Sequence, residues 1–187
     1  ESISDYKNKL ATLKDAVNFF DSTNYLLGLS KMQYQLSLFY TNLDDLDNAV
    51  KSLNAALETE KKIGDSTRIT RGLCLIGLFY LRNDFLDTAR HYFNACVTRS
   101  SKLNDYSNLV QSKFHLGEIL YHEGKINEAI IHQEKVNELA VQLEEMQWYL
   151  KSAIELGKYY RKQKKFNKAK EYYDEIIFLA EKYQHER

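Results

Sequence analysis

The sequence predicts an all-α protein, a solenoid built from antiparallel helical hairpins. Its 187 residues contain no proline and only seven glycines, so very little in the chain interrupts a helix. A second observation is an internal repeat with a period of 40 residues. Units of equal length that each form a helical hairpin stack on their neighbours, and the chain is long enough for about nine helices.

Four segments align without a gap at this spacing. They begin at Tyr34, Cys74, Phe114 and Ile154 and read YQLSLFYTNLDDLDNAVKSL, CLIGLFYLRNDFLDTARHYF, FHLGEILYHEGKINEAIIHQ and IELGKYYRKQKKFNKAKEYY. Each copy has a small residue (Ser37, Gly77, Gly117, Gly157) and, twelve positions later, an alanine (Ala49, Ala89, Ala129, Ala169). Two helices approach closely only where side chains are small, so these pairs are predicted to mark the hairpin crossings.

The connections between the aligned segments carry helix-ending and helix-starting signals. Gly64 and Asn104 suit a left-handed residue at a helix end, and Asp65 and Asp105 suit the N-cap of the next helix. The expected repeats are residues 25–64, 65–104, 105–144 and 145–184, and residues 1–21 read as the second helix of a truncated repeat. Residues 1–187 are thus expected to form one repeat domain within a longer protein.

This pattern resembles the tetratricopeptide repeat, in which a small residue follows an aliphatic one, an aromatic follows three positions later, and the second helix carries an alanine. The usual tryptophan of the first helix is absent, since Gln33, Leu73, Lys113 and Ala153 occupy its place. The resemblance implies a right-handed superhelix whose first helices line a concave, peptide-binding groove. Lys- and Asn-rich repeats of about 40 residues also look like the sensor domains of bacterial peptide-responsive regulators.

Composition excludes several classes of protein. Lys plus Arg and Asp plus Glu number 26 each, so no net field draws the chain to nucleic acid or to a membrane surface. No apolar run of about 18 residues is present that could span a bilayer. The two cysteines form no CxxC pair, which favours a reducing compartment over a disulfide scaffold and leads us to expect a cytoplasmic protein.

Catalytic motifs are missing from the sequence. There is no GxSxG, no glycine-rich phosphate loop and no cysteine with a companion-histidine signature, so we expect neither an enzyme nor a cofactor. His115, Glu118 and His122 fall within about 60° of one another around a helix and could converge. Their spacing matches neither HExxH nor HxxEH, and we interpret them as polar groove lining without a metal.

The repeat register places a row of apolar residues with basic neighbours on the expected concave face. The predicted peptide-binding residues are Lys31, Tyr34, Leu38, Arg71, Leu78, Leu81, Arg82, Phe114, Glu118, Tyr121, His122, Lys151 and Lys158. An extended apolar surface of this kind commonly marks a binding site, and here apolar anchors are expected to set the affinity.

Two functions from different classes are compatible with this pattern. In the first, the groove binds a peptide or a segment of another protein in a regulatory module. In the second, the solenoid is a scaffold that acts through its ends, and copies associate through terminal helices because Ile177 and Phe178 are expected to be partly exposed. The basic cluster of residues 161–170 is followed at once by acidic residues, so we interpret it as a solvated face and do not expect nucleic acid.

Overall fold

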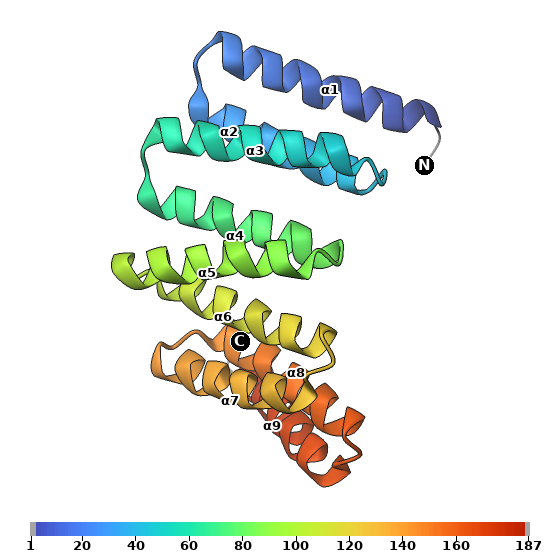
Figure 1. Ribbon diagram of the computed structural model, residues 1–187, viewed down its shortest axis with the longest axis vertical. Coiled ribbons are helices and arrows are strands. Elements are labelled where there is room, and N and C mark those ends of the chain that lie inside the picture. Colours follow the sequence, from blue (N-terminus) through green and yellow to red (C-terminus); the bar gives the residue numbers. More distant parts are fainter. Residues whose placement is uncertain (1–2, 186–187) are drawn as a thin grey trace. The chain divides into compact units, whose positions relative to one another are not determined.

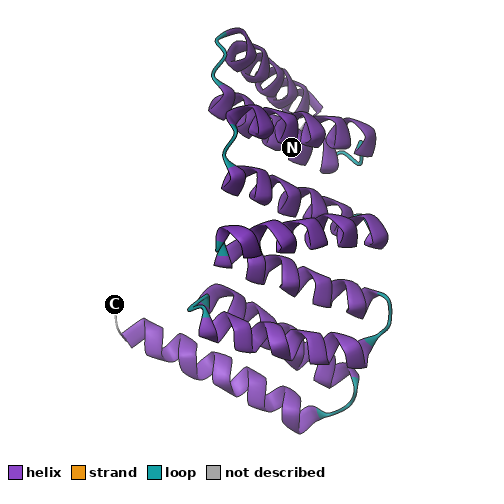
Figure 2. Cartoon of the chain, turned by 60° about the vertical axis from the view of Figure 1, so that its left-hand side comes forward, coloured by secondary structure: helices purple, strands orange, loops and turns teal. Residues whose placement is uncertain are grey.

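The computed structural model describes residues 3–185, which form nine α-helices and no strand (Figures 1 and 2). The helices are α1 (Ile3–Ser22), α2 (Leu26–Thr41), α3 (Leu46–Ile63), α4 (Ser66–Arg82), α5 (Leu86–Leu103), α6 (Tyr106–His122), α7 (Ile126–Gln142), α8 (Met146–Lys162) and α9 (Phe166–His185). The predicted all-α fold with nine helices is confirmed. The chain falls into two compact units, Glu1–Ile76 and Gly77–Arg187, whose boundary lies inside α4 and which are described separately.

Every turn between helices contains one left-handed residue, and these residues are spaced 20 apart. They are Asn24, Asp44, Gly64, Asp84, Asn104, Gly124, Glu144 and Lys164. The left-handed helix ends predicted at Gly64 and Asn104 are confirmed, with φ of 78° and 54°. Each hairpin is therefore two equal halves, and the 40-residue period is explained by helices longer than those of a 34-residue repeat.

Aspartates begin three of the helices by capping backbone amides. Asp105 accepts a hydrogen bond from the backbone N–H of Asn108, and Asp65 accepts from the amides of the following turn, as the sequence predicted. Asp45 caps α3 in the same way through the amide of Asn48, a cap that the sequence analysis did not single out. These caps fix where the second and third hairpins and α3 begin.

The hairpin crossings lie where the small residues predicted them. All four repeat alanines are buried: Ala49, Ala89, Ala129 and Ala169. The glycines, however, face a different residue from the one we expected. A Cβ atom added at Gly77 would lie 2.9 Å from the ring of Phe93, and one at Gly157 would collide with the ring of Tyr173. The glycine therefore makes room for the large side chain four positions beyond the alanine, and not for the alanine.

Within each unit, consecutive helices pack against one another. In the first unit α1 packs on α2 and α2 on α3, and in the second unit α5 through α9 pack in chain order. Helix α6 also contacts α8, so the first helices of the third and fourth repeats are neighbours. Trp148 of α8 joins Phe114 of α6 and Val136 of α7 in one core cluster, which holds these three helices together.

Candidate peptide-binding surface

Helix α8 presents one free face lined by basic side chains around an isoleucine. Lys151, Ile154 and Lys158 follow one another at helical spacing and are exposed, and Arg161 and Lys162 continue the exposed face to the end of the helix. The rest of α8 is committed to packing, since residues such as Ala153 and Leu156 are completely buried. Ile154 is 37% exposed, which makes it an apolar side chain that a ligand can reach. We call the residues Lys151, Ile154 and Lys158 the α8 stripe.

The two lysines of the α8 stripe are held differently. The Nζ atom of Lys151 lies 4.0 Å from the ring centroid of Trp148, a cation–π contact that aims the ammonium group without neutralising it. The Nζ atom of Lys158 lies 2.5 Å from Oε1 of Glu155, one turn back on the same helix. The Lys158 side chain is 49% exposed, whereas that of Glu155 is 17% exposed. Water therefore reaches the ammonium group, and Lys158 can exchange Glu155 for a ligand carboxylate.

The histidines of α6 do not converge into one site. Nδ1 of His115 lies 2.5 Å from Oε2 of Glu118, and the His115 ring stacks on Phe93 with centroids 5.0 Å apart. Nδ1 of His122 instead lies 3.9 Å from Oδ1 of Asp84. His115 and Glu118 are thus a local pair on α6, and the described part of the chain holds no group of three or more His, Cys, Asp or Glu side chains that could bind a metal.

Tyr121 of α6 lies at the edge of this surface and stacks on Tyr159 of α8. The ring centroids are 4.5 Å apart and the planes differ by 11°. Burial, together with the carboxylates of Glu155 and Glu118, raises the pKa of Tyr159 far above the ordinary tyrosine value. Tyr159 therefore stays neutral and serves as a packing platform, while Tyr121 is only partly buried and can still contact a ligand.

Two of the predicted apolar groove residues belong to the core instead, and a third packs against it. Leu81 is 6% and Phe114 is 4% exposed, and Leu78 packs against the cluster that contains Leu81. Neither Leu81 nor Phe114 can act as a ligand anchor in this conformation. The reason is that these side chains lie between adjacent helices, where neighbouring elements cover them. The basic residue Arg82 at the end of α4 remains exposed.

The first unit carries a similar mixture on α2 and the first part of α4. Lys31, Leu38 and Arg71 are all exposed. Tyr34 is partly buried, and its hydroxyl group has no hydrogen-bond partner. Burial is the largest effect on Tyr34 and raises its pKa to about 12, with the Glu60 carboxylate as the second cause.

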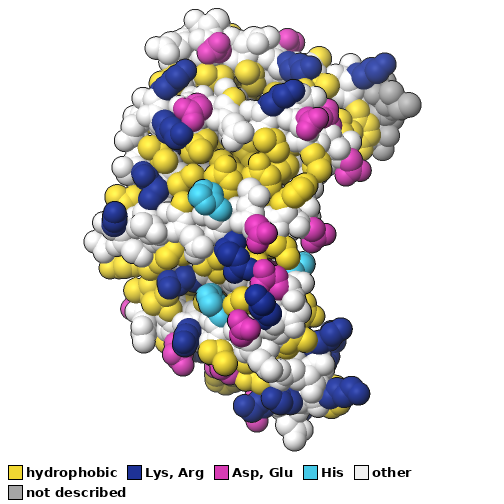
Figure 3. All heavy atoms as spheres, viewed as in Figure 1, with side chains coloured by type: hydrophobic (Ala, Val, Ile, Leu, Met, Phe, Trp, Pro, Cys, Tyr) yellow, Lys and Arg dark blue, Asp and Glu magenta, His cyan; other side chains and the backbone are white. Residues whose placement is uncertain are grey.

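Sequence reasoning left Ile154, Trp148 and Glu155 out of the predicted site. Ile154 had a usable signal, because it begins the fourth aligned segment and shares its register with Tyr34 and Phe114. Trp148 and Glu155 act by positioning the two lysines, and no repeat pattern marks them. Over the face shown in Figure 3, basic and acidic side chains are mixed, in keeping with the zero net charge.

Within the residues that the structure describes, no helix is long and apolar enough to cross a membrane. Both cysteines are buried and neither is a free thiol, so the cysteine count no longer supports a reducing compartment.

Sequence comparison matches two of the repeats to a family model. Residues 30–63 and 150–183 match the model of the tetratricopeptide repeat family, while no curated protein matches the chain in sequence.

Solved structures share the fold at low sequence identity. BtubC from P. vanneervenii has a TM-score of 0.81 at 15% identity, over 97% of this chain and 75% of that one. The TPR-like repeats of a putative kinesin light chain from Podosopora anserina have a TM-score of 0.68 at 18% identity, over 96% of this chain and 89% of that one. NprR in complex with its cognate peptide NprX has a TM-score of 0.70 at 21% identity, over 95% of this chain and 51% of that one. Two segments of this chain thus match the tetratricopeptide repeat model, and the chain shares the fold of TPR-like helical solenoids.

Proposed function

We propose that the chain is a non-catalytic regulatory module that binds a peptide or protein segment on the exposed face of its first helices. The observation that supports this most directly is the α8 stripe, where an accessible isoleucine lies between two lysines on a helix face that no other helix covers. The tetratricopeptide fold generally serves as an interaction scaffold, and NprR, a structural neighbour, was solved with its cognate peptide. Tyr121 and Glu118 of α6 border the same surface.

The chemistry of the α8 stripe suits a ligand with acidic groups on both sides of one apolar side chain. Complete burial of a large aliphatic side chain contributes about 1.5 to 3 kcal/mol. Because only about a third of the Ile154 side chain is exposed, its burial by a ligand can contribute about 0.5 to 1 kcal/mol. Each exposed lysine adds about 0 to 1 kcal/mol. Since Leu81 and Phe114 are buried, basic side chains have a larger share in affinity than the sequence suggested.

This division of energy predicts a salt-dependent interaction. Exposed charges are screened over about 10 Å at 0.1 M salt, so added salt should weaken binding and slow association more than it speeds release. A ligand anchored mainly by apolar contacts would show little change over the same range.

The test begins with peptides selected from a random library by the intact chain, whose affinities are then measured by fluorescence anisotropy. Lys151→Glu and Ile154→Asp each remove a favourable contact and place a carboxylate next to an acidic ligand, so each should weaken the selected peptides severalfold. Lys135→Glu and Ile131→Asp are the matched controls, because both residues are exposed on α7, a second helix. Equal losses for stripe and control variants would rule out the first-helix face as the site.

The first unit is tested in the same way. Lys31, Leu38 and Arg71 form the corresponding set there, and Arg71→Glu and Leu38→Asp are its informative variants. If the peptide uses only the second unit, these two variants should bind it with wild-type affinity.

A second candidate function, a scaffold that associates through its end, is favoured by one observation. Ile177 and Phe178 of α9 are both more than half exposed, as the sequence predicted. Sedimentation velocity with the wild-type chain and with a Phe178→Asp variant would test this function. A concentration-dependent dimer that the substitution removes would favour the scaffold, and a wild-type monomer at all concentrations would exclude association through this face.

A further inference from the structure

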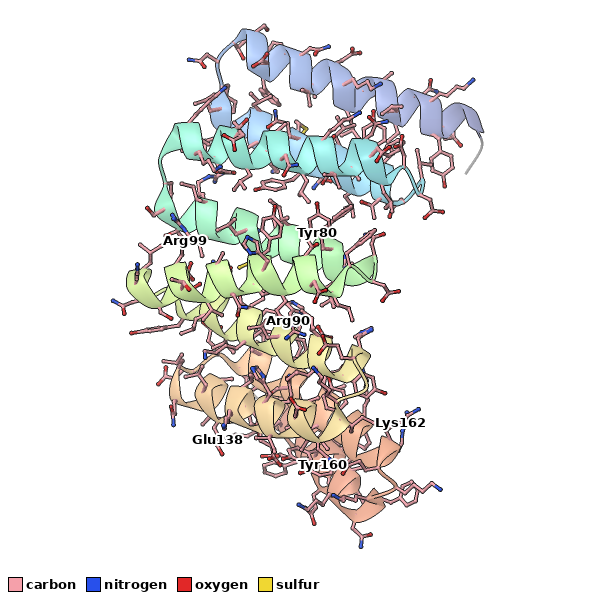
Figure 4. All side chains as sticks on the ribbon, in the orientation of Figure 1. Tyr80, Arg90, Arg99, Glu138, Tyr160 and Lys162 are labelled. Carbon is pink, nitrogen blue, oxygen red and sulfur yellow. The ribbon has the colours of Figure 1, made fainter. Side chains whose placement is uncertain are left out.

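A separate cleft lies in the second unit, between the second helices α7 and α9 and over α8. It is a depression of about 270 Å³ lined by Glu134, Tyr160, Lys168, Glu171, Tyr172 and Glu175. Small-molecule sites usually measure roughly 300 to 1,000 Å³, so the cleft suits a single long side chain better than a cofactor. Figure 4 labels Tyr160 and, on α7, the nearby Glu138. We refer to this depression as the tyrosine cleft.

Two stacked tyrosines line the cleft, and hydrogen bonds fix two of its carboxylates. Tyr160 is only 4% exposed, so Tyr172, which is partly buried, is the tyrosine ring that a ligand can reach. The rings of Tyr160 and Tyr172 lie 5.8 Å apart with planes 14° from parallel. The Tyr160 hydroxyl donates to Oε1 of Glu134 at 2.6 Å, and the Tyr149 hydroxyl donates to Oε1 of Glu175. Each carboxylate is thereby oriented, and its Oε2 atom is left for another donor.

Packing explains the tyrosines but not the acidic residues. Eighty residues earlier in the same register, Tyr80 and Tyr92 stack in the same way, with centroids 5.7 Å apart and planes at 9°. Around this earlier pair, Thr88, His91 and Ala95 occupy the positions that correspond to Lys168, Glu171 and Glu175. The stacked pair therefore forms without flanking carboxylates, so the charges around Tyr160 and Tyr172 are an addition specific to this place.

The cleft is electrostatically negative and already accepts a cation. The carboxylates of Glu134, Glu175, Glu171 and Glu138 all add to burial in raising the pKa of Tyr172. The basic residue of the lining is Lys168, whose Nζ atom lies 5.1 Å from the Tyr160 ring centroid, and the Nζ atom of Lys165 lies 5.9 Å from the same centroid. The ring face thus holds an ammonium group at cation–π distance, which shows the kind of group that the cleft accommodates.

We infer that the tyrosine cleft binds an arginine side chain from a basic segment of a partner protein. A guanidinium group is planar, stacks on aromatic faces and donates several hydrogen bonds at fixed angles, which matches a tyrosine wall with oriented carboxylates on two sides. Charge complementarity selects this occupant over an acidic or apolar one. The cleft is lined mainly by the second helices α7 and α9 and contains no residue of the α8 stripe, so a basic segment and an acidic peptide would use different surfaces.

The test uses the full chain and a fluorescein-labelled peptide of alternating glycine and arginine, with fluorescence anisotropy as the readout. A peptide with citrulline in place of arginine keeps the shape of the side chain and removes its charge. Glu171→Gln, at an exposed position, and Glu175→Gln, which retains an acceptor for Tyr149, should each weaken the arginine peptide about tenfold. Lys168→Gln removes the nearer of the two lysine ammonium groups at the Tyr160 ring and should strengthen binding severalfold.

The controls separate a specific cleft from general attraction between opposite charges. Glu128→Gln removes an exposed carboxylate from α7 outside the cleft and should leave affinity unchanged, as should Lys151→Glu in the α8 stripe. Citrulline peptide binding as tightly as arginine peptide would overturn the inference. The inference also fails if Glu128→Gln costs as much as Glu171→Gln, or if Lys168→Gln weakens binding. Because Lys151→Glu tests the proposed peptide surface independently, failure of one proposal is distinguishable from failure of the other.

Discussion

A buried ion pair between Arg68 and Glu60 joins three helices of the first unit. Nε of Arg68 lies 2.6 Å from Oε2 of Glu60 and its Nη2 atom lies 2.8 Å from Oε1, a bidentate arrangement between α4 and α3. Ser30 of α2 donates its hydroxyl to the same carboxylate at 2.7 Å. The Glu60 side chain is only 3% exposed, whereas that of Arg68 is 37% exposed.

Substitution of Arg68 by methionine should therefore be costly. It leaves a buried carboxylate with Ser30 as its remaining side-chain partner, and loss of one partner of a buried pair typically costs about 3 to 5 kcal/mol. Because Arg68 is more than a third exposed, water can replace part of its contribution, so we expect about 2 to 3 kcal/mol. Replacing both partners, with Glu60→Leu added, removes the unpaired charge and should restore most of the loss.

Urea unfolding followed by circular dichroism, combined with amide hydrogen exchange of α2 and α3, measures this effect. A loss of about 2 to 3 kcal/mol corresponds to roughly 30- to 150-fold faster exchange of amides that open with the unit. Lys61→Met is the matched control, because Lys61 and Glu58 also lie 2.6 Å apart but are 51% and 64% exposed. Its cost should stay below about 0.5 kcal/mol. Equal costs for Arg68→Met and Lys61→Met would refute the argument that burial decides the strength of the pair.

Ala89→Leu should overpack the second hairpin crossing, where Ala89 is fully buried, and lower the free energy of unfolding by about 1 to 3 kcal/mol in urea; an unchanged value would place the crossing elsewhere. Lys164 holds a φ of 60°, so Lys164→Gly should stabilise the chain by about 0.5 to 1 kcal/mol, whereas Lys135→Gly inside α7 should destabilise it by a similar amount in the same melts. The pKa of Tyr34 is raised from 10.0 to about 12, so the unfolded chain loses this proton first as the pH rises. The free energy of unfolding should then fall between pH 10 and 12, by at most about 1.4 kcal/mol per pH unit, and Tyr34→Phe should make that fall smaller.

Most of the fold could be predicted from the repeat register. Six of the eight left-handed turn positions hold Asn, Asp or Gly, the residues that adopt this conformation most easily, so turn chemistry alone could locate them. Glu144 and Lys164 hold the same conformation although neither residue type favours it. There the lengths of the flanking helices impose the turn, and only the 20-residue spacing could have revealed it.

The candidate site was predicted less completely, because register identifies a helix face but not its burial. Phe114 and Ile154 occupy equivalent positions in the third and fourth repeats, yet Phe114 is 4% and Ile154 is 37% exposed. Phe114 is covered because Trp148 of α8 packs against it, with ring centroids 5.4 Å apart. Exposure thus depends on which neighbour the next repeat supplies, and a pattern within one repeat does not contain that information.

Gln133 shows how much deviation this packing tolerates. It occupies the position that Phe93 and Tyr173 fill in the adjacent hairpins of the second unit, and a Cβ atom at Gly117 would collide with its side chain. The residue is completely buried, and neither amide atom has a hydrogen-bond partner. An unpaired buried polar group costs about 1 to 3 kcal/mol, a loss that neither neighbouring crossing incurs through its ring.

The third hairpin is consequently the least favourable of these three crossings, although it bears His115, Glu118 and Tyr121 on its first helix. Its backbone nevertheless keeps the 20-residue spacing at Gly124 and Glu144. The turns and the shared helix contacts therefore set the geometry of the repeat, and the chemistry of a single core position adjusts its stability.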